Sequence, residues 1–132
     1  MSFYKIITHP VTLIISFLYI LISGEHVGGP YIWYLLMAAP YGIGRVWWAF
    51  AGILSLLISR TQPVEKRKVL RSCLRITGSL ELAISLFVFF RVENKNCYNC
   101  STFEQTIPLI TLILFGVLGI LVIIRSAREL VR

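Results

Sequence analysis

Two cysteines at CxxC spacing form the clearest chemical pattern in this sequence. Cys97 and Cys100 stand in the segment Asn-Cys-Tyr-Asn-Cys-Ser. This spacing suits a structural disulfide, and it can also lower a thiol pKa for redox exchange. Zinc is a further alternative, although a tetrahedral site needs four ligands and only Glu25 and His26 of another loop are available to help. Asn99 also begins a glycosylation sequon, which matters only in a secretory compartment.

Two charged residues stand inside long apolar runs, Arg45 in the second run and Glu81 in the third. A charge at the centre of a bilayer costs about 2.5–3.5 kcal/mol on insertion scales. Pairing the two residues across a helix bundle would offset that cost. We therefore predict an intramembrane charged pair, which acts either as a structural clasp or as part of an ion, proton or substrate path. A protonated Glu81 and an Arg45 that reaches the outer surface are the remaining alternatives.

A polar stripe surrounds Glu81. Thr77, Glu81 and Ser85 follow one another at intervals of four residues, so they share a helix face, and Gly78 lies beside them. Small and polar residues in membrane helices usually face protein rather than lipid. Small residues on the second apolar run offer a matching surface: Gly44, Gly52 and Ser55. The stripe predicts helix packing within one chain or an oligomer interface.

Basic residues gather between the second and third apolar runs. The predicted basic patch consists of Lys66, Arg67, Lys68, Arg71 and Arg75. Such a juxtamembrane cluster attracts anionic lipid head groups at about 1 kcal/mol per base near the surface. An acidic cytosolic protein partner is the alternative. Because these bases flank apolar runs, no nucleic acid partner is expected.

The composition is that of a membrane protein. Of the 132 residues, 57% are hydrophobic and 14% are charged, with a net charge of +7. Soluble domains carry about 25% charged residues. We expect a single transmembrane domain over residues 1–132 that contacts membrane lipids along most of its surface.

Four apolar runs predict the helices that position these side chains. A membrane helix needs about 20 mostly apolar residues. The first run is longer than the core of a secretory signal, so we interpret it as a retained helix. The second run is too long for one untilted crossing, and we expect a kink or break between Pro40 and Gly44. The expected helices cover about residues 6–23, 31–59, 63–91 and 107–130.

Loop charges predict the orientation. Residues 60–75 contain six Lys or Arg and one Glu, whereas residues 23–30 contain no Lys or Arg. The positive-inside rule places the basic loop and the basic C-terminal tail in the cytoplasm. The sequence therefore predicts an all-α, polytopic four-helix bundle in a plasma or inner membrane, with both termini cytoplasmic.

Three functions fit this form. The first is a non-enzymatic subunit that assembles into a homo-oligomer or with a membrane or cytosolic protein partner. The second is a small channel or transporter built on Arg45 and Glu81. The third is a thiol oxidoreductase, which resembles membrane thiol oxidases that pass electrons to quinone. Those proteins use a second cysteine pair, whereas the other cysteine here is the isolated Cys73. No cofactor and no metal is predicted.

Overall fold

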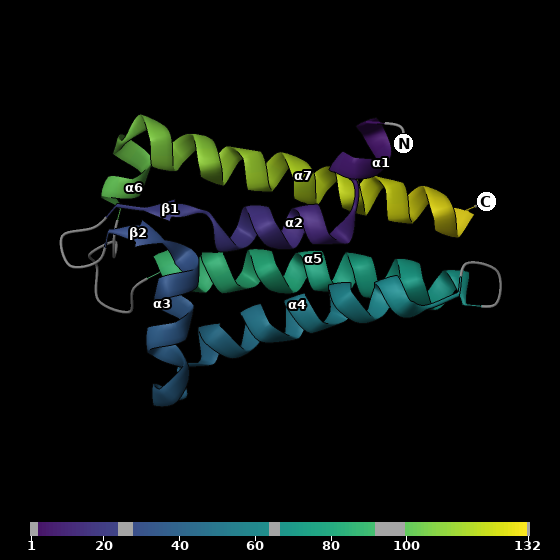
Figure 1. Ribbon diagram of the computed structural model, residues 1–132, viewed down its shortest axis with the longest axis horizontal. Helices are drawn as coiled ribbons and strands as arrows, with labels where there is room; N and C mark the ends of the chain where they lie inside the picture. Colours follow the sequence, from purple (N-terminus) through teal and green to yellow (C-terminus); the bar gives the residue numbers. More distant parts are fainter. Residues whose placement is uncertain (1–2, 24–27, 64–66, 92–99, 132) are drawn as a thin grey trace.

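The computed structural model describes residues 3–23, 28–63, 67–91 and 100–131, and most of them are helical (Figure 1). Because the sequence is apolar over long stretches, backbone groups are satisfied within helices rather than by water. The elements in chain order are α1 (Phe3–Ile7), α2 (Pro10–Leu18), β1 (Leu21–Ile22), β2 (Gly29–Pro30), α3 (Tyr31–Ala38), the 3-10 helix η1 (Ala39–Tyr41), α4 (Gly44–Thr61), α5 (Lys68–Phe90), α6 (Ser101–Glu104) and α7 (Thr106–Val131).

Four of these helices run alongside one another. In Figure 1, α2 and α5 lie between α7 on one side and α4 on the other. The end of α4, the start of α5 and the end of α7 meet at one end of the bundle, near α1. The start of α7 lies at the opposite end with α3, α6 and the two short strands. The bundle thus has two distinct ends, joined by α4, α5 and α7.

Among the described residues, two helices are long and apolar enough to cross a membrane, α5 with 23 residues and α7 with 26. At 1.5 Å per residue they measure about 34 and 39 Å, against a hydrocarbon core about 30 Å thick. Counting the bent pair α3–α4 as one span gives up to three. The chain therefore has the features of a membrane protein.

The second apolar run breaks where the sequence predicts. The chain bends by 118° between the α3–η1 segment and α4. Pro40 stands in η1, where its missing N–H and its ring prevent α3 from continuing. Gly42 then adopts a left-handed φ of 63°, a conformation that favours glycine. The run is thus a short helix followed by a full-length one.

The single helix expected over residues 6–23 is wrong. α1 ends at Ile7, and His9 caps a new helix by accepting a hydrogen bond from the Val11 N–H at its Nδ1 atom. Pro10 is the first residue of α2, a position that tolerates its missing N–H. α2 ends at Leu18 after nine residues, about 14 Å, which is less than half the bilayer core.

The end of the first run pairs with the start of the second. β1 and β2 are antiparallel, with Leu21 opposite Pro30 and Ile22 opposite Gly29. This pairing satisfies backbone groups that a helix would otherwise satisfy. Ile20 and Ile22 of this region are buried in the core, whereas Tyr19 is exposed.

The other two helices lie close to their expected ranges. α5 begins at Lys68 rather than at Pro63, with Arg67 as its N-cap, and ends at Phe90. α7 extends one residue beyond the expected range at each end. In both helices the apolar run marks only part of the length. Residues 68–75 of α5 and 125–131 of α7 continue the helices through basic segments, and Pro63 lies outside α5.

Aromatic rings fill the core at the α3 end of the bundle. Phe17 of α2 packs edge-on against Tyr31 of α3, with ring centroids 5.2 Å apart. Tyr31 also packs edge-on against Phe89 of α5, again at 5.2 Å. Phe115 of α7 lies 5.5 Å from Phe17. Phe17, Tyr31 and Phe89 are fully buried, so this cluster joins α2, α3, α5 and α7.

Candidate functional site

Arg45 lies in the first turn of α4, directly after the break. Its guanidinium stands over the rings of Tyr34 and Phe89, at 5.2 and 5.6 Å from their centroids. A cation over an aromatic face is stabilised by the quadrupole of the ring. The Nε atom of Arg45 is buried and has no hydrogen-bond partner among the described residues. The break in the second run thus places a cation against the aromatic cluster.

Glu81 has a different partner from the one that the sequence suggests. Its carboxylate accepts a hydrogen bond from the Ser55 hydroxyl of α4 at 3.1 Å. Arg45 and Glu81 do not form an ion pair, since every salt bridge between described residues contains Glu129. Arg45 lies beside Ser85, four residues and about 6 Å along α5 from Glu81. The expected direct contact therefore needs correcting, and each charge meets another group.

The residues of the polar stripe on α5 differ in burial. Ser85 is buried, donates a hydrogen bond to the Arg45 carbonyl at 2.8 Å, and lies 3.2 Å from the Tyr31 hydroxyl. Thr77 is exposed and donates to the Cys73 carbonyl of its own helix at 2.9 Å. The prediction that the stripe faces protein holds for Ser85 and is wrong for Thr77.

Two glycines bring α4 and α5 into close contact. A Cβ atom on Gly52 would lie 2.9 Å from the Gly78 carbonyl oxygen and 2.8 Å from Leu82. A Cβ atom on Gly78 would lie 3.0 Å from the Gly52 carbonyl oxygen. Gly44, also expected at this surface, has open space around it. The close contact between α4 and α5 at these glycines, which we call the α4–α5 seam, thus depends on one glycine from each helix.

A cluster of charges that the sequence analysis missed lies at the other end of the bundle. Glu129 of α7 accepts hydrogen bonds from Arg71 of α5 at 3.1 Å and from Arg125 at 3.3 Å, and Arg75 lies 3.5 Å away. Arg125 also donates to the Thr8 hydroxyl. We call Arg71, Arg75, Arg125 and Glu129 the Glu129 cluster.

The Glu129 cluster changes the interpretation of the predicted basic patch. Arg71 and Arg75 point into the bundle, where their side chains are only 11% and 12% exposed. Arg67 remains exposed and donates to Gln62 at 3.3 Å, whereas Lys66 lies outside the described residues. A single basic surface containing all five residues is therefore wrong. The four-residue spacing of Arg71 and Arg75, with that of Arg125 and Glu129, was the available signal.

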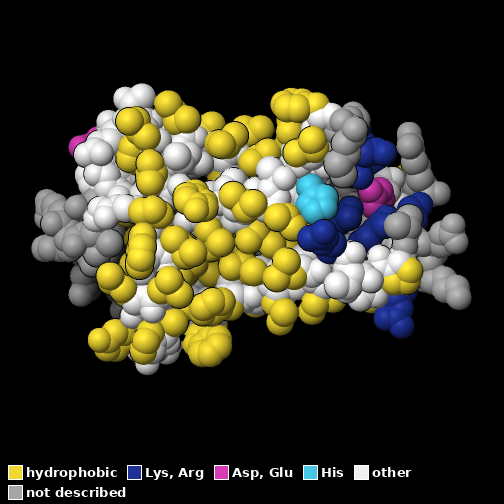
Figure 2. Space-filling model, in the orientation of Figure 1, with side chains coloured by type: hydrophobic (Ala, Val, Ile, Leu, Met, Phe, Trp, Pro, Cys, Tyr) yellow, Lys and Arg dark blue, Asp and Glu magenta, His cyan; other side chains and the backbone are white. Residues whose placement is uncertain are grey.

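His9 lies close to this cluster, just before α2. Burial and the charges of Arg60, Arg75 and Arg125 lower the pKa of His9 below its ordinary value of 6.5. His9 is therefore neutral at pH 7. Since its Nδ1 accepts the Val11 N–H, we infer that its proton is on Nε2. Figure 2 shows a histidine side chain with basic side chains beside it at this end.

The candidate disulfide cannot be placed as a pair. Cys100 precedes α6 as its N-cap residue, while Cys97 lies outside the described residues. Glu25, His26 and Asn99 also lie outside them. Next to Cys100, Ser101 and Thr102 both donate to the Ser23 carbonyl, which joins α6 to β1. The disulfide, zinc and glycosylation hypotheses remain predictions.

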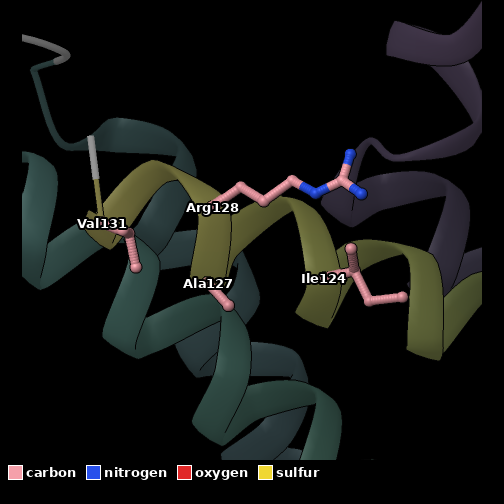
Figure 3. A pocket seen from close by; sticks show the side chains of 4 residues that line it. All are labelled: Ile124, Ala127, Arg128 and Val131. Carbon is pink, nitrogen blue, oxygen red and sulfur yellow. The ribbon is translucent and has the colours of Figure 1, made fainter.

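A shallow depression of about 490 Å³ lies on α7 (Figure 3). It is lined by Ile124, Ala127, Arg128 and Val131, and the Arg128 side chain extends along the helix toward Ile124. All four residues come from one helix, so no groups from different elements converge there. We assign no chemistry to this depression.

Comparison of the chain with protein families, with curated proteins and with solved structures finds no match.

Proposed function

We propose that this chain is a non-enzymatic membrane subunit that assembles with further copies of itself. The observation that carries the proposal is a contrast between two exposed apolar surfaces. Large exposed side chains on α7 are aliphatic over its first four turns, as in Ile110, Ile113 and Val117. Those on α3, η1 and α4 are mainly aromatic or sulfur-containing. We call the following residues the aromatic surface: Trp33, Met37, Tyr41, Trp47 and Trp48.

This contrast supports different neighbours for the two surfaces. Aliphatic side chains match lipid tails, whereas aromatic residues and Met are enriched in protein interfaces. Trp33 and Met37 are 59% and 64% exposed, and Trp47 is 63% exposed. Homo-oligomer interfaces are also more apolar than other interfaces. An aromatic belt at the membrane–water boundary is the competing explanation, so the experiment has to separate the two.

The charged groups within the bundle fit such a structural role. Glu81 contacts Ser55, and Arg45 contacts aromatic rings. Both contacts join α4 to its neighbours, and neither needs a substrate. A protein partner other than a second copy is the other form of this proposal, and it predicts a complex of unequal chains.

Mass measurement of the purified full-length chain in lipid particles tests the proposal. The native chain should form a defined multimer, and replacing Trp33 and Trp47 with Ala should shift it toward monomer. The matched control replaces Ile113 and Ile120 of α7 with Ala, because these residues are equally exposed but aliphatic. A native chain that is monomeric at every concentration, or equal behaviour of both variants, would contradict the proposal.

One observation favours a second candidate, a small transporter. α4 starts at the break with Arg45 in its first turn, and discontinuous helices often line binding sites. The buried Nε of Arg45, which lacks a hydrogen-bond partner among the described residues, is a possible contact for an anion. This candidate predicts anion flux into liposomes that Arg45→Gln abolishes without unfolding the protein. Absence of flux in the native chain would remove it. Thiol exchange remains a prediction, because Cys97 is not described.

A further inference from the structure

The Glu129 cluster carries more positive charge than its carboxylate can balance. Three guanidinium groups share one carboxylate, which leaves two positive charges without an acidic partner among the described residues. Two of these groups, Arg71 and Arg75, are almost fully buried. Uncompensated buried charge is costly, so buried arginines normally have further anionic contacts.

The same region has unused hydrogen-bond donors. The Nε atoms of Arg71 and Arg75 are buried and have no partner among the described residues. The Ser72 hydroxyl between them in sequence is fully buried and is also without a partner in this part of the chain. Buried donors of native proteins are nearly always satisfied, and an unsatisfied group can indicate a missing ion.

One further basic residue, Arg60, and one histidine, His9, lie outside the cluster and extend it. His9 directly follows Thr8, whose hydroxyl accepts a hydrogen bond from Arg125 of the cluster. Arg60, near the end of α4, acts on His9 together with Arg75 and Arg125, and burial together with these three charges lowers its pKa. Arg60 is exposed and Arg125 is 27% exposed, so an anion can approach from outside the bundle. The Nε2–H of His9 adds a neutral donor to this group. Basic groups of α4, α5 and α7 thus act on the same residue, His9.

We propose that Arg60, Arg75, Arg125 and His9 form a binding site for a phosphate group. Guanidinium groups bind phosphate oxygens with paired N–H donors and remain charged at any physiological pH. Arg71, Arg75 and Arg125 keep their contacts with Glu129, and the phosphate would contact the N–H groups that this carboxylate leaves unused, such as the Nε–H of Arg75. The site goes beyond the assembly role and would stand if that role failed. It shares only Arg75 with the predicted basic patch, since Arg60, Arg125 and His9 lie outside that patch.

A phosphate group can come from a lipid head group or from solution. The site lies where α4 ends, α5 begins and α7 ends, beyond the most apolar parts of α5 and α7. Head groups of a surrounding bilayer would lie at this depth. Both sources offer the same phosphate oxygens to the arginines. The experiment therefore tests a phospholipid and inorganic phosphate separately.

The test measures lipid retention by the full-length chain in vesicles of phosphatidylcholine with increasing phosphatidic acid. Native mass spectrometry then counts the phosphatidic acid molecules that stay bound. Arg60→Gln should weaken retention about tenfold, the loss of one charge-assisted contact, because Arg60 is exposed and its replacement spares the core. Arg75→Gln should weaken it at least as much. The matched control is Arg67→Gln, an exposed arginine near the same end, which should change retention by less than about twofold.

Inorganic phosphate at constant ionic strength identifies the source. If it displaces phosphatidic acid, the site takes phosphate from solution as well, and if it does not, the lipid head group is the ligand. Two results would overturn the proposal. One is equal weakening by Arg60→Gln and Arg67→Gln, which is the behaviour of diffuse surface attraction. The other is a native chain that retains no more phosphatidic acid than phosphatidylcholine.

Discussion

Glu81 of α5 accepts a hydrogen bond from Ser55 of α4 at 3.1 Å, next to the close approach of Gly52 and Gly78. A small hydroxyl donor reaches the carboxylate there, because the two helices are close. The sequence suggests Arg45 as the partner of Glu81. Arg45 belongs to α4 and lies beside Ser85, which is four residues beyond Glu81 on α5. The charge of Glu81 therefore stabilises the α4–α5 seam through a neutral partner.

Replacing Glu81 or Ser55 tests how much their hydrogen bond stabilises the contact between α4 and α5. Glu81→Gln keeps an oxygen that can accept the Ser55 hydroxyl, so we expect little change in the free energy of unfolding. Ser55→Ala removes the donor and should cost about 1 kcal/mol. Thermal unfolding in detergent measures both variants. A large loss for Glu81→Gln with none for Ser55→Ala would show that the carboxylate has another partner.

Removing the carboxylate of Glu129 should lower the free energy of unfolding much more than replacing Glu81 or Ser55. Glu129→Gln leaves three arginines facing one another, and we expect a loss of about 3 kcal/mol in the free energy of unfolding. Chemical unfolding of the full-length chain gives this value. The matched control is Glu104→Gln on α6, which is exposed and should be nearly neutral. Equal effects of the two substitutions would argue against a structural cluster.

The α4–α5 seam predicts that alanine substitutions at Gly52 and Gly116 have different effects on stability. Gly52→Ala places a methyl group 2.9 Å from the Gly78 carbonyl oxygen, and the helices must separate at a cost of about 1–3 kcal/mol. Gly116→Ala on α7 meets nothing within 4 Å and should be neutral or slightly stabilising. Melting temperatures of both variants test this difference. A neutral Gly52→Ala would mean that the seam is looser than the structure indicates.

His9 should make stability depend on pH. Because burial and then Arg60, Arg75 and Arg125 lower its pKa from 6.5, the folded chain binds this proton less readily than the unfolded chain. The contribution of neutral His9 is therefore complete above pH 6.5 and decreases as the pH falls from there toward the lowered pKa. His9→Asn keeps a capping acceptor but does not titrate. Melting curves of the two proteins should diverge below pH 6.5, and parallel curves would contradict the assignment.

Helices with uninterrupted apolar runs could be predicted from the sequence. The apolar run places the start of α7 within a residue, and Pro40 with Gly42 marks the break before α4. The first run could not be predicted in this way. Its apolar residues suit both a membrane helix and a buried core, and only packing shows that Leu13 and Phe17 are fully buried.

The pairing of charges was harder to predict than the helices. Arg45 and Glu81 stand out in sequence because each is a lone charge in an apolar run. Which partner each one meets depends on the register of α4 against α5, which the glycines set. Glu129 was missed because it stands in a basic tail, where a single acid resembles an ordinary surface residue until α5 and α7 are placed together.

We expect α5 to cross a lipid bilayer, with the Glu129 cluster at one side of it. Arg67 and Arg91 stand at opposite ends of α5, directly outside the helix. Trypsin added to sealed membrane vesicles of uniform orientation should therefore cleave after one of these residues and not the other, and permeabilising the vesicles should expose both. Cleavage after both residues in vesicles that remain sealed would contradict the account.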